Sequence, residues 1–126
     1  MAKYVDGFVF VVPNKKVSEY EKMARVGARM WKKHGALDYK ECKGEDLNPK
    51  MPKGMEHLVF PKMAKAKPTE TVWFSYIVYR SKKHRDTVNA KVMKEMGKEM
   101  KKYKDKLMPF DMKRFAYGGF EVVVSI

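Results

Sequence analysis

The stretch Thr71–Asn89, which reads TVWFSYIVYRSKKHRDTVN, decides the fold, because it changes from a strand pattern to a helix pattern within a few residues. Residues Thr71–Tyr79 are apolar or aromatic at nearly every position, which is typical of a strand in the middle of a sheet. Ser81 occupies the position of a helix cap, and a helix begins at Lys82. The stretch therefore predicts a central strand that leads directly into a helix.

The rest of the chain repeats this alternation of strand and helix. An apolar strand is predicted over Tyr4–Val12, and an amphipathic helix over Lys15–His34. A shorter, more polar strand over Ala36–Cys42 suits a sheet edge, and a last strand is expected over Arg114–Ser125. The order is β-α-β, loop, β-α-β, which predicts an α+β, ferredoxin-like domain spanning residues 1–126. Its antiparallel four-stranded sheet would carry two helices on one face, with the first and third strands central.

Two segments depart from this regular pattern. Residues Lys43–Pro68 contain four of the six prolines, and a long irregular loop of this kind often serves as a lid, arm or contact surface. Within it, Leu58–Phe60 could add a short strand. The second long helix is expected over Lys82–Tyr103, with a kink or break at Gly97.

The two central strands carry more apolar surface than one layer of helices can cover. In both Tyr4–Val12 and Thr71–Tyr79, the two alternating sets of side chains are largely apolar. Leaving one set in water is unfavourable at about 25 cal/mol per Å². We therefore expect a homodimer in which a second copy covers the open face of the sheet.

Composition limits the classes of function. The 126 residues carry a net charge of +13, which favours an acidic partner such as nucleic acid or an anionic membrane surface. The apolar runs are too short to span a membrane. A single cysteine, Cys42, excludes an internal disulfide and favours a reducing cytoplasm. The histidines and Cys42 lack metal-ligand spacing, and phosphate-binding glycine motifs are absent, so neither a metal nor a nucleotide cofactor is predicted.

Several motifs resemble those of the YbaA-like family of small bacterial proteins of unknown function. The matching segments are Tyr4–Val9 (YVDGFV), His34–Tyr39 (HGALDY), Tyr79–Asp86 (YRSKKHRD), Met108–Asp111 (MPFD) and Tyr117–Val122 (YGGFEV). The resemblance covers essentially the whole chain and implies a dimeric α+β barrel of the ferredoxin-like kind. Related architectures include cofactor-independent monooxygenases, haem-degrading enzymes, isomerases and ligand-binding or stress proteins. The resemblance carries over no catalytic residues, and the high lysine content departs from the family pattern.

Arg85 and Asn89 are the leading candidates for ligand anchors. They lie one turn apart in the middle of the apolar face of the second helix. A guanidinium and an amide at these positions could hold an anionic or carbonyl-bearing ligand. The alternative is an ion pair of Arg85 with Asp6, Glu41 or Asp111, while the amide satisfies backbone groups.

Other candidates come from histidine and the aromatic residues. His84 lies in the first turn of the second helix, where the helix dipole favours a neutral imidazole. It is the only acid–base candidate, although such a histidine is more often part of the helix cap. Trp31, Tyr39, Trp73 and Tyr76 could line a pocket for a planar ligand, although core packing is the default for aromatics at these spacings.

Three classes of function follow from these observations. The first is a cytoplasmic homodimer that binds a small molecule or acts as a cofactor-independent enzyme, with one pocket per subunit between the two helices and the sheet. The second is a nucleic-acid-binding protein that uses its lysine-rich helix faces. The third is a structural or stress protein without a ligand.

Overall fold

The computed structural model describes residues 3–100 and 110–126, and its centre is a four-stranded antiparallel sheet of order β2-β3-β1-β4. Strand β1 spans Tyr4–Pro13, β2 Asp38–Lys43, β3 Glu70–Tyr79 and β4 Ala116–Glu121. The most apolar strands, β1 and β3, pair along their whole length in the middle. The predicted ferredoxin-like order, the two central strands and the edge position of β2 are confirmed.

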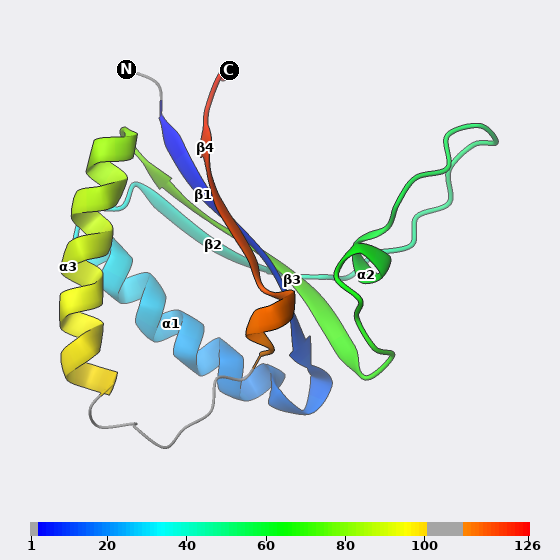
Figure 1. Ribbon diagram of the computed structural model, residues 1–126, viewed down its shortest axis with the longest axis horizontal. Coiled ribbons are helices and arrows are strands. Elements are labelled where there is room, and N and C mark those ends of the chain that lie inside the picture. The colour runs from blue at the N-terminus through cyan, green and yellow to red at the C-terminus, as the bar shows by residue number, and fades with distance from the viewer. Residues whose placement is uncertain (1–2, 101–109) are drawn as a thin grey trace.

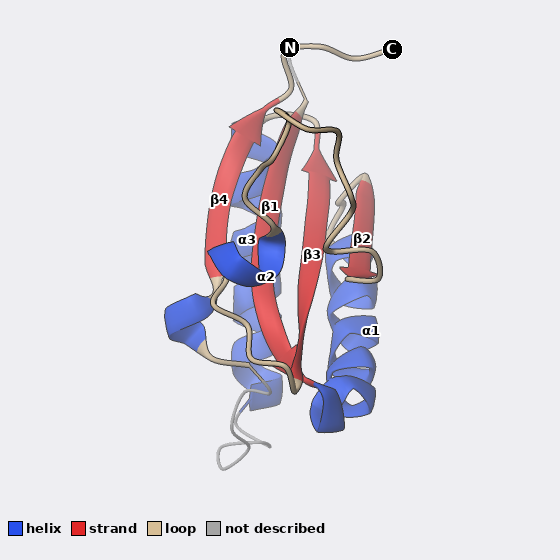
Figure 2. Cartoon of the chain, turned by 90° about the vertical axis from the view of Figure 1, so that its right-hand side faces the viewer, coloured by secondary structure: helices blue, strands red, loops and turns tan. Residues whose placement is uncertain are grey.

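Two long helices cover one face of this sheet (Figures 1 and 2). Helix α1 spans Val17–Lys33 and follows a short 3-10 turn at Asn14–Lys16, and α3 spans Lys82–Met100. The Ser81 hydroxyl accepts a hydrogen bond of 3.1 Å from the backbone N–H of His84, which confirms the predicted cap. No helix in residues 3–100 or 110–126 is both long and apolar enough to cross a membrane.

The main core lies between these helices and the sheet. At one end Tyr20 of α1 packs edge-to-face against Phe10 and Trp73. At the other end Val88 and Val92 of α3 pack against the sheet, in a cluster that also contains Ile77 and Tyr79. Each long helix therefore buries one face against the sheet, through Tyr20 of α1 and through Val88 and Val92 of α3.

Two local expectations differ from the structure. Leu58–Phe60 forms no strand, because Phe60 begins the short helix α2 (Phe60–Met63), in whose first turn a proline is well tolerated. The described part of α3 runs through Gly97 without a break. Gly97 is exposed with nothing near it, so it costs only about 1 kcal/mol of helix propensity. The part of the prediction beyond Met100 lies outside the described residues.

The second face of the sheet is only partly covered by its own chain. Ala64, just after α2, packs on Val11 and Val72 and buries one end of this face. Elsewhere the face stays open, with Phe74 46% exposed and Phe120 61% exposed. We call this surface the open face.

A long segment, residues 44–59, extends away from the sheet on the side opposite α1 and α3 (Figure 1). It and α2 carry the exposed apolar side chains Met51, Met55, Leu58, Phe60 and Met63. A bidentate ion pair of 2.7 Å per bond between Arg114 and Glu70 joins the chain just before β4 to the start of β3. Arg114 also donates to the carbonyl of Lys65, which follows α2. This cluster therefore connects the segment around α2 to the sheet.

Candidate functional site

A cavity of about 160 Å³ lies between the two long helices and the sheet. Most of its wall is apolar or aromatic and is formed by Phe8, Phe10, Met23, Ala24, Gly27, Trp31, Ile77, Met96, Phe110 and Phe115. The remaining wall carries four polar side chains, Tyr20, Tyr39, Glu41 and Ser75. The site thus has the mostly apolar wall and the few convergent polar groups that are typical of a small-molecule pocket.

The polar wall is organised around the Glu41 carboxylate. The Tyr20 hydroxyl lies 2.9 Å from both carboxylate oxygens, and the Tyr39 hydroxyl donates to Oε1 at 2.8 Å. The Ser75 hydroxyl donates to Oε2. Three hydroxyl groups from three different elements therefore converge on one carboxylate.

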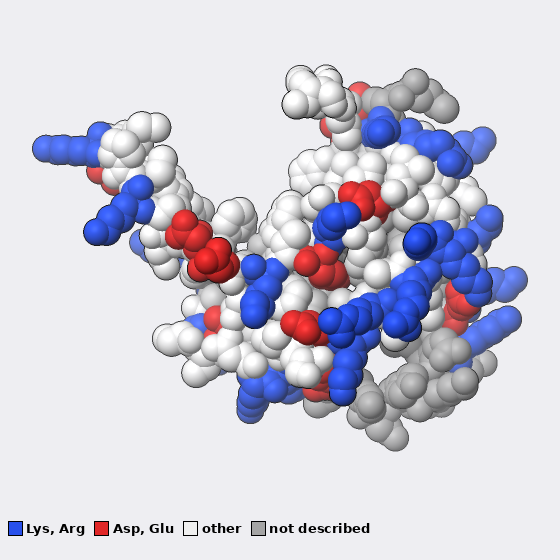
Figure 3. Space-filling view, turned by 180° about the vertical axis from the view of Figure 1, so that it is seen from behind, with Lys and Arg blue, Asp and Glu red and all other residues white. Residues whose placement is uncertain are grey.

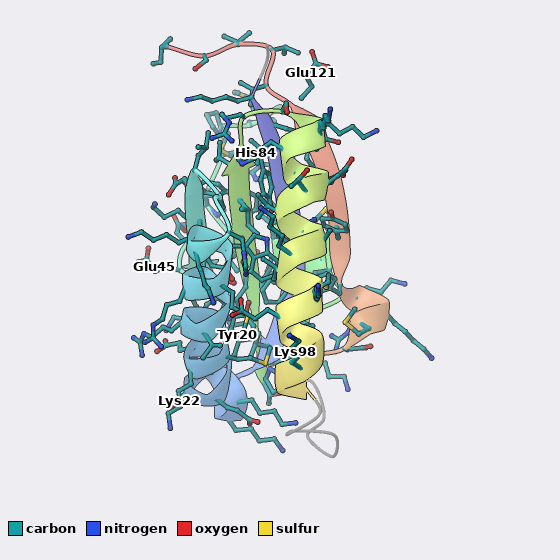
Figure 4. All side chains as sticks on the ribbon, turned by 90° about the vertical axis from the view of Figure 1, so that its left-hand side faces the viewer. Tyr20, Lys22, Glu45, His84, Lys98 and Glu121 are labelled. Atoms are coloured by element: carbon teal, nitrogen blue, oxygen red, sulfur yellow. The ribbon has the colours of Figure 1, made fainter. Side chains whose placement is uncertain are left out.

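Strand register and helix position explain this convergence. Glu41 of β2 pairs with Ser75 of β3, and Tyr39 pairs with Ile77, so alternation places all four side chains on the helix-covered face. Tyr20 points from α1 into the space between α1 and α3, whereas Lys22 points away from the protein (Figure 4). A β-carbon at Gly27 would lie 3.3 Å from the Tyr39 hydroxyl, so glycine permits the close approach of α1.

Both tyrosines keep their protons at neutral pH. Burial raises the pKa of Tyr20 far above its ordinary value, and the negative charge and hydrogen bond of Glu41 raise it further. Burial and Glu41 raise the pKa of Tyr39 in the same way. Each hydroxyl hydrogen is therefore available to Glu41 throughout the physiological range.

A shallower groove of about 380 Å³ lies outside this cavity. Ala24, Tyr39 and Glu41 belong to the walls of both hollows, so the cavity and the groove adjoin at the carboxylate. Arg25 and Lys43 contribute cationic side chains to the groove.

The structure places Arg85 and Asn89 in a separate network, away from the described wall of the cavity. Arg85 Nη1 lies 2.7 Å from a carboxylate oxygen of Asp6, which is only 1% exposed. The Tyr117 hydroxyl donates to the other oxygen at 3.1 Å. Asn89 Oδ1 accepts from the side chains of Trp31 and Tyr79, each at 3.1 Å. Protein groups therefore engage both side chains, and the ion pair with Asp6, which was the alternative, is present. A role of Arg85 and Asn89 as ligand anchors stays a prediction.

Of the other predicted site residues, two line the cavity and the others are not among the described residues of its wall. Trp31 and Tyr39 do line the cavity. Tyr76 pairs with Gly7 and Lys40 on the open face, so it lies on the wrong side of the sheet to line this pocket. His84 accepts a hydrogen bond from the backbone N–H of Arg80 and is not among the described residues of the wall. Burial, and then the charge of Arg80, lower the pKa of His84, so its imidazole is neutral as expected.

Sequence reasoning missed Glu41, Tyr20 and Ser75 as members of the site. The sequence contained one signal for these residues. Tyr39 and Glu41 lie on the same face of one strand, and a tyrosine lies on the apolar side of a helix. The hydrogen bonds join residues 21 and 34 positions apart, and their register cannot be read from either segment alone. Among the residues the structure describes, no three histidine, cysteine or acidic side chains gather closely enough to hold a metal ion.

The strand order defines a ferredoxin-like α+β protein, with a cavity between its helices and its sheet. A family model described as "Protein of unknown function (DUF1428)" matches residues 3–112. The chain belongs to this family, and the resemblance to YbaA-like proteins is confirmed. It is 43% identical over 123 residues to "Uncharacterized protein YbaA" of Escherichia coli strain K12, with 98% of each chain covered. The protein of the same name from Shigella flexneri gives the same values.

One solved structure shares the fold over the full length of both chains. It is described as a dimeric ferredoxin-like protein from an uncultured marine organism. The TM-score is 0.60 at 12% sequence identity, with 100% of each chain covered. At this identity the similarity supports the fold and nothing about the ligand.

Proposed function

We propose that this protein binds a small, largely apolar molecule in the cavity between α1, α3 and the sheet. The cavity itself is the observation that carries the proposal. Its mostly apolar wall with a few convergent polar groups is the kind of surface that binds small molecules. At about 160 Å³, this cavity matches the size, about 150 Å³, of an engineered apolar cavity that binds benzene.

Toluene binding tests this proposal with a matched pair of variants. Ala24→Leu places a larger side chain into the cavity wall, and Ala90→Leu makes the same change at an exposed position of α3. Toluene should raise the melting temperature of the wild type and of Ala90→Leu, because a ligand that binds only the folded state stabilises it. It should leave Ala24→Leu unchanged. Equal shifts in all three proteins would refute binding in this cavity.

The same proposal includes a homodimer formed through the open face. Phe74 and Phe120 are exposed there, and Val5, Val9 and Val78 are only half-buried. The segment 44–59 adds further apolar side chains on the same side of the sheet (Figure 2). Contiguous exposed apolar surface of this kind marks interaction sites. The dimeric description of the marine protein that shares the fold supports a second copy as the occupant.

Catalysis at this site would require an acid–base group in the cavity wall. Glu41 is such a group, whereas His84 is not part of the described wall. A cofactor-independent enzyme that works here, in the reducing cytoplasm that the cysteine content favours, would therefore use Glu41 in place of His84.

A second candidate function is electrostatic binding of nucleic acid. Lysine and arginine side chains gather over one side of the protein in Figure 3. On α1 the exposed cations are Lys22, Arg25, Arg29, Lys32 and Lys33. Binding through these residues should weaken steeply with added salt, because cations that contact phosphates release counterions. Arg29→Glu should reduce the salt slope and Lys53→Glu, on the protruding segment, should not. An affinity that does not depend on salt would contradict this function.

A further inference from the structure

We infer that the cavity ligand is a neutral, one-ring aromatic molecule with a hydroxyl group, a phenol, whose hydroxyl donates a hydrogen bond to Glu41. This inference rests on the proposed binding function and adds the chemical class and the orientation of the ligand. Three features of the site carry it: the hydrogen bonds at Glu41, the charge of its wall and the size of the cavity.

The hydrogen bonds at Glu41 leave room for one more donor. An ionised carboxylate has about four lone-pair positions for hydrogen bonds. The hydroxyls of Tyr20, Tyr39 and Ser75 supply one hydrogen each, although Tyr20 lies 2.9 Å from both oxygens. Three hydrogens therefore reach the carboxylate, and one acceptor position remains for a ligand.

The polar wall offers acceptors and no free donors. The hydroxyl hydrogens of Tyr20 and Tyr39 are directed at Glu41, and the raised pKa values of both tyrosines keep these hydrogens in place at neutral pH. A ligand must therefore bring the donor. An anionic ligand would meet the negative charge of Glu41 beside a largely apolar wall, where an unpaired charge is costly to bury.

The cost of removing charges from water favours a hydroxyl over an ammonium group. Burying an ammonium group beside the Glu41 carboxylate removes two charges from water, and this penalty can exceed their attraction. A hydroxyl carries one hydrogen, which matches the one remaining position at Glu41. Hydrogen bonds to a charged acceptor are also stronger than those between neutral groups.

The size and shape of the cavity complete the assignment. A volume of about 160 Å³ accommodates one benzene-sized ring. The rings of Phe8, Phe10 and Phe115 provide faces and edges for aromatic packing. A phenol can place its ring among these side chains while its hydroxyl reaches Glu41.

The test compares phenol, toluene, benzylamine and benzoate on the purified full-length protein by titration calorimetry. The variants are Glu41→Gln and, as a matched control, Glu45→Gln, which makes the same change at an exposed carboxylate. In Glu41→Gln the affinity for phenol should fall about tenfold or more, because a charged acceptor is replaced by a neutral one. Toluene affinity should stay within about twofold in both variants, since toluene donates no hydrogen bond. Glu45→Gln should bind phenol like the wild type.

Three results would overturn the inference. These are equal losses of phenol and toluene affinity in Glu41→Gln, binding of benzoate as tight as that of phenol, or tighter binding of benzylamine than of phenol. Failure of the wild type to bind toluene and phenol alike would instead refute the proposed binding function itself.

Tyr39→Phe provides an independent test should Glu41→Gln fail to fold. It keeps the ring and removes one hydroxyl hydrogen from Glu41. The hydroxyl of phenol can replace this hydrogen, so phenol affinity should stay equal or rise while toluene affinity is unchanged. A fall in phenol affinity in Tyr39→Phe would refute the assigned orientation.

Discussion

Replacing Phe74 with alanine should dissociate the proposed homodimer without unfolding the protomer. Phe74 lies on the open face and is 46% exposed, so its ring contributes little to the protomer's own core. If a phenylalanine side chain presents about 200 Å², about 90 Å² of Phe74 is left for a partner to cover. At about 25 cal/mol per Å² this area contributes about 2 kcal/mol per copy.

Two-fold symmetry doubles this effect. The pair of Phe74 side chains would contribute about 4 kcal/mol, so the dimer dissociation constant should rise about 1,000-fold. Sedimentation equilibrium over a wide range of protein concentration measures this change. Far-ultraviolet circular dichroism should be unchanged, because the ring lies outside the helix-covered core.

Val26→Ala is the matched control for this experiment. Val26 is 48% exposed, as Phe74 is, but it lies on α1, which covers the other face of the sheet. Its replacement should leave the dimer dissociation constant within about twofold, in line with a change outside the interface. A wild type that stays monomeric at millimolar concentration would refute the reasoning, as would equal effects of the two substitutions.

The remaining predictions concern the two ion pairs. The Arg114 guanidinium lowers the pKa of Glu70 from 4.5 to about 2, so the pair stabilises the protein fully above pH 4.5 and loses this effect as the pH falls toward 2. Glu70→Gln should therefore lower the free energy of unfolding by about 2 kcal/mol at pH 7, and urea titrations should show this difference shrinking between pH 4.5 and 2. Arg85→Met should cost about 3 kcal/mol in the same assay, because it leaves the buried Asp6 carboxylate without its cation. Phenol affinity should not change in Arg85→Met, and a loss of binding without a loss of stability would restore Arg85 as a ligand anchor.

The element order and the central strands could be predicted because each depends on local pattern. The apolar run of Thr71–Tyr79 identifies β3 as central, and Ser81 marks the start of α3. The prediction that both alternating sets of the central strands are apolar also holds. Phe10 and Trp73, however, are buried beneath the helices. The apolar surface of the central strands that stays uncovered therefore belongs to Phe74 and its neighbours on the open face.

The polar site could be predicted only in part, because the structure contains two separate hydrogen-bond networks that are built from similar types of residue. Arg85 and Asn89 lie on the inward face of α3, as the helical period requires. That period alone does not show that Asp6 lies opposite them and accepts their hydrogen bonds. Glu41 was expected only as one of three partners for Arg85. The strand register instead pairs Glu41 with Ser75. This register depends on the whole sheet.

Methionine methyl groups give the most direct test of ligand binding in the cavity. Met23 and Met96 line the cavity, whereas Met51 and Met55 lie exposed on the protruding segment. In a protein labelled with ¹³C at the methionine methyls, increasing phenol should shift the signals of Met23 and Met96 with a common saturating curve and leave those of Met51 and Met55 in place. Signals that all drift together without saturation, or a shift confined to Met51 and Met55, would contradict binding in the cavity.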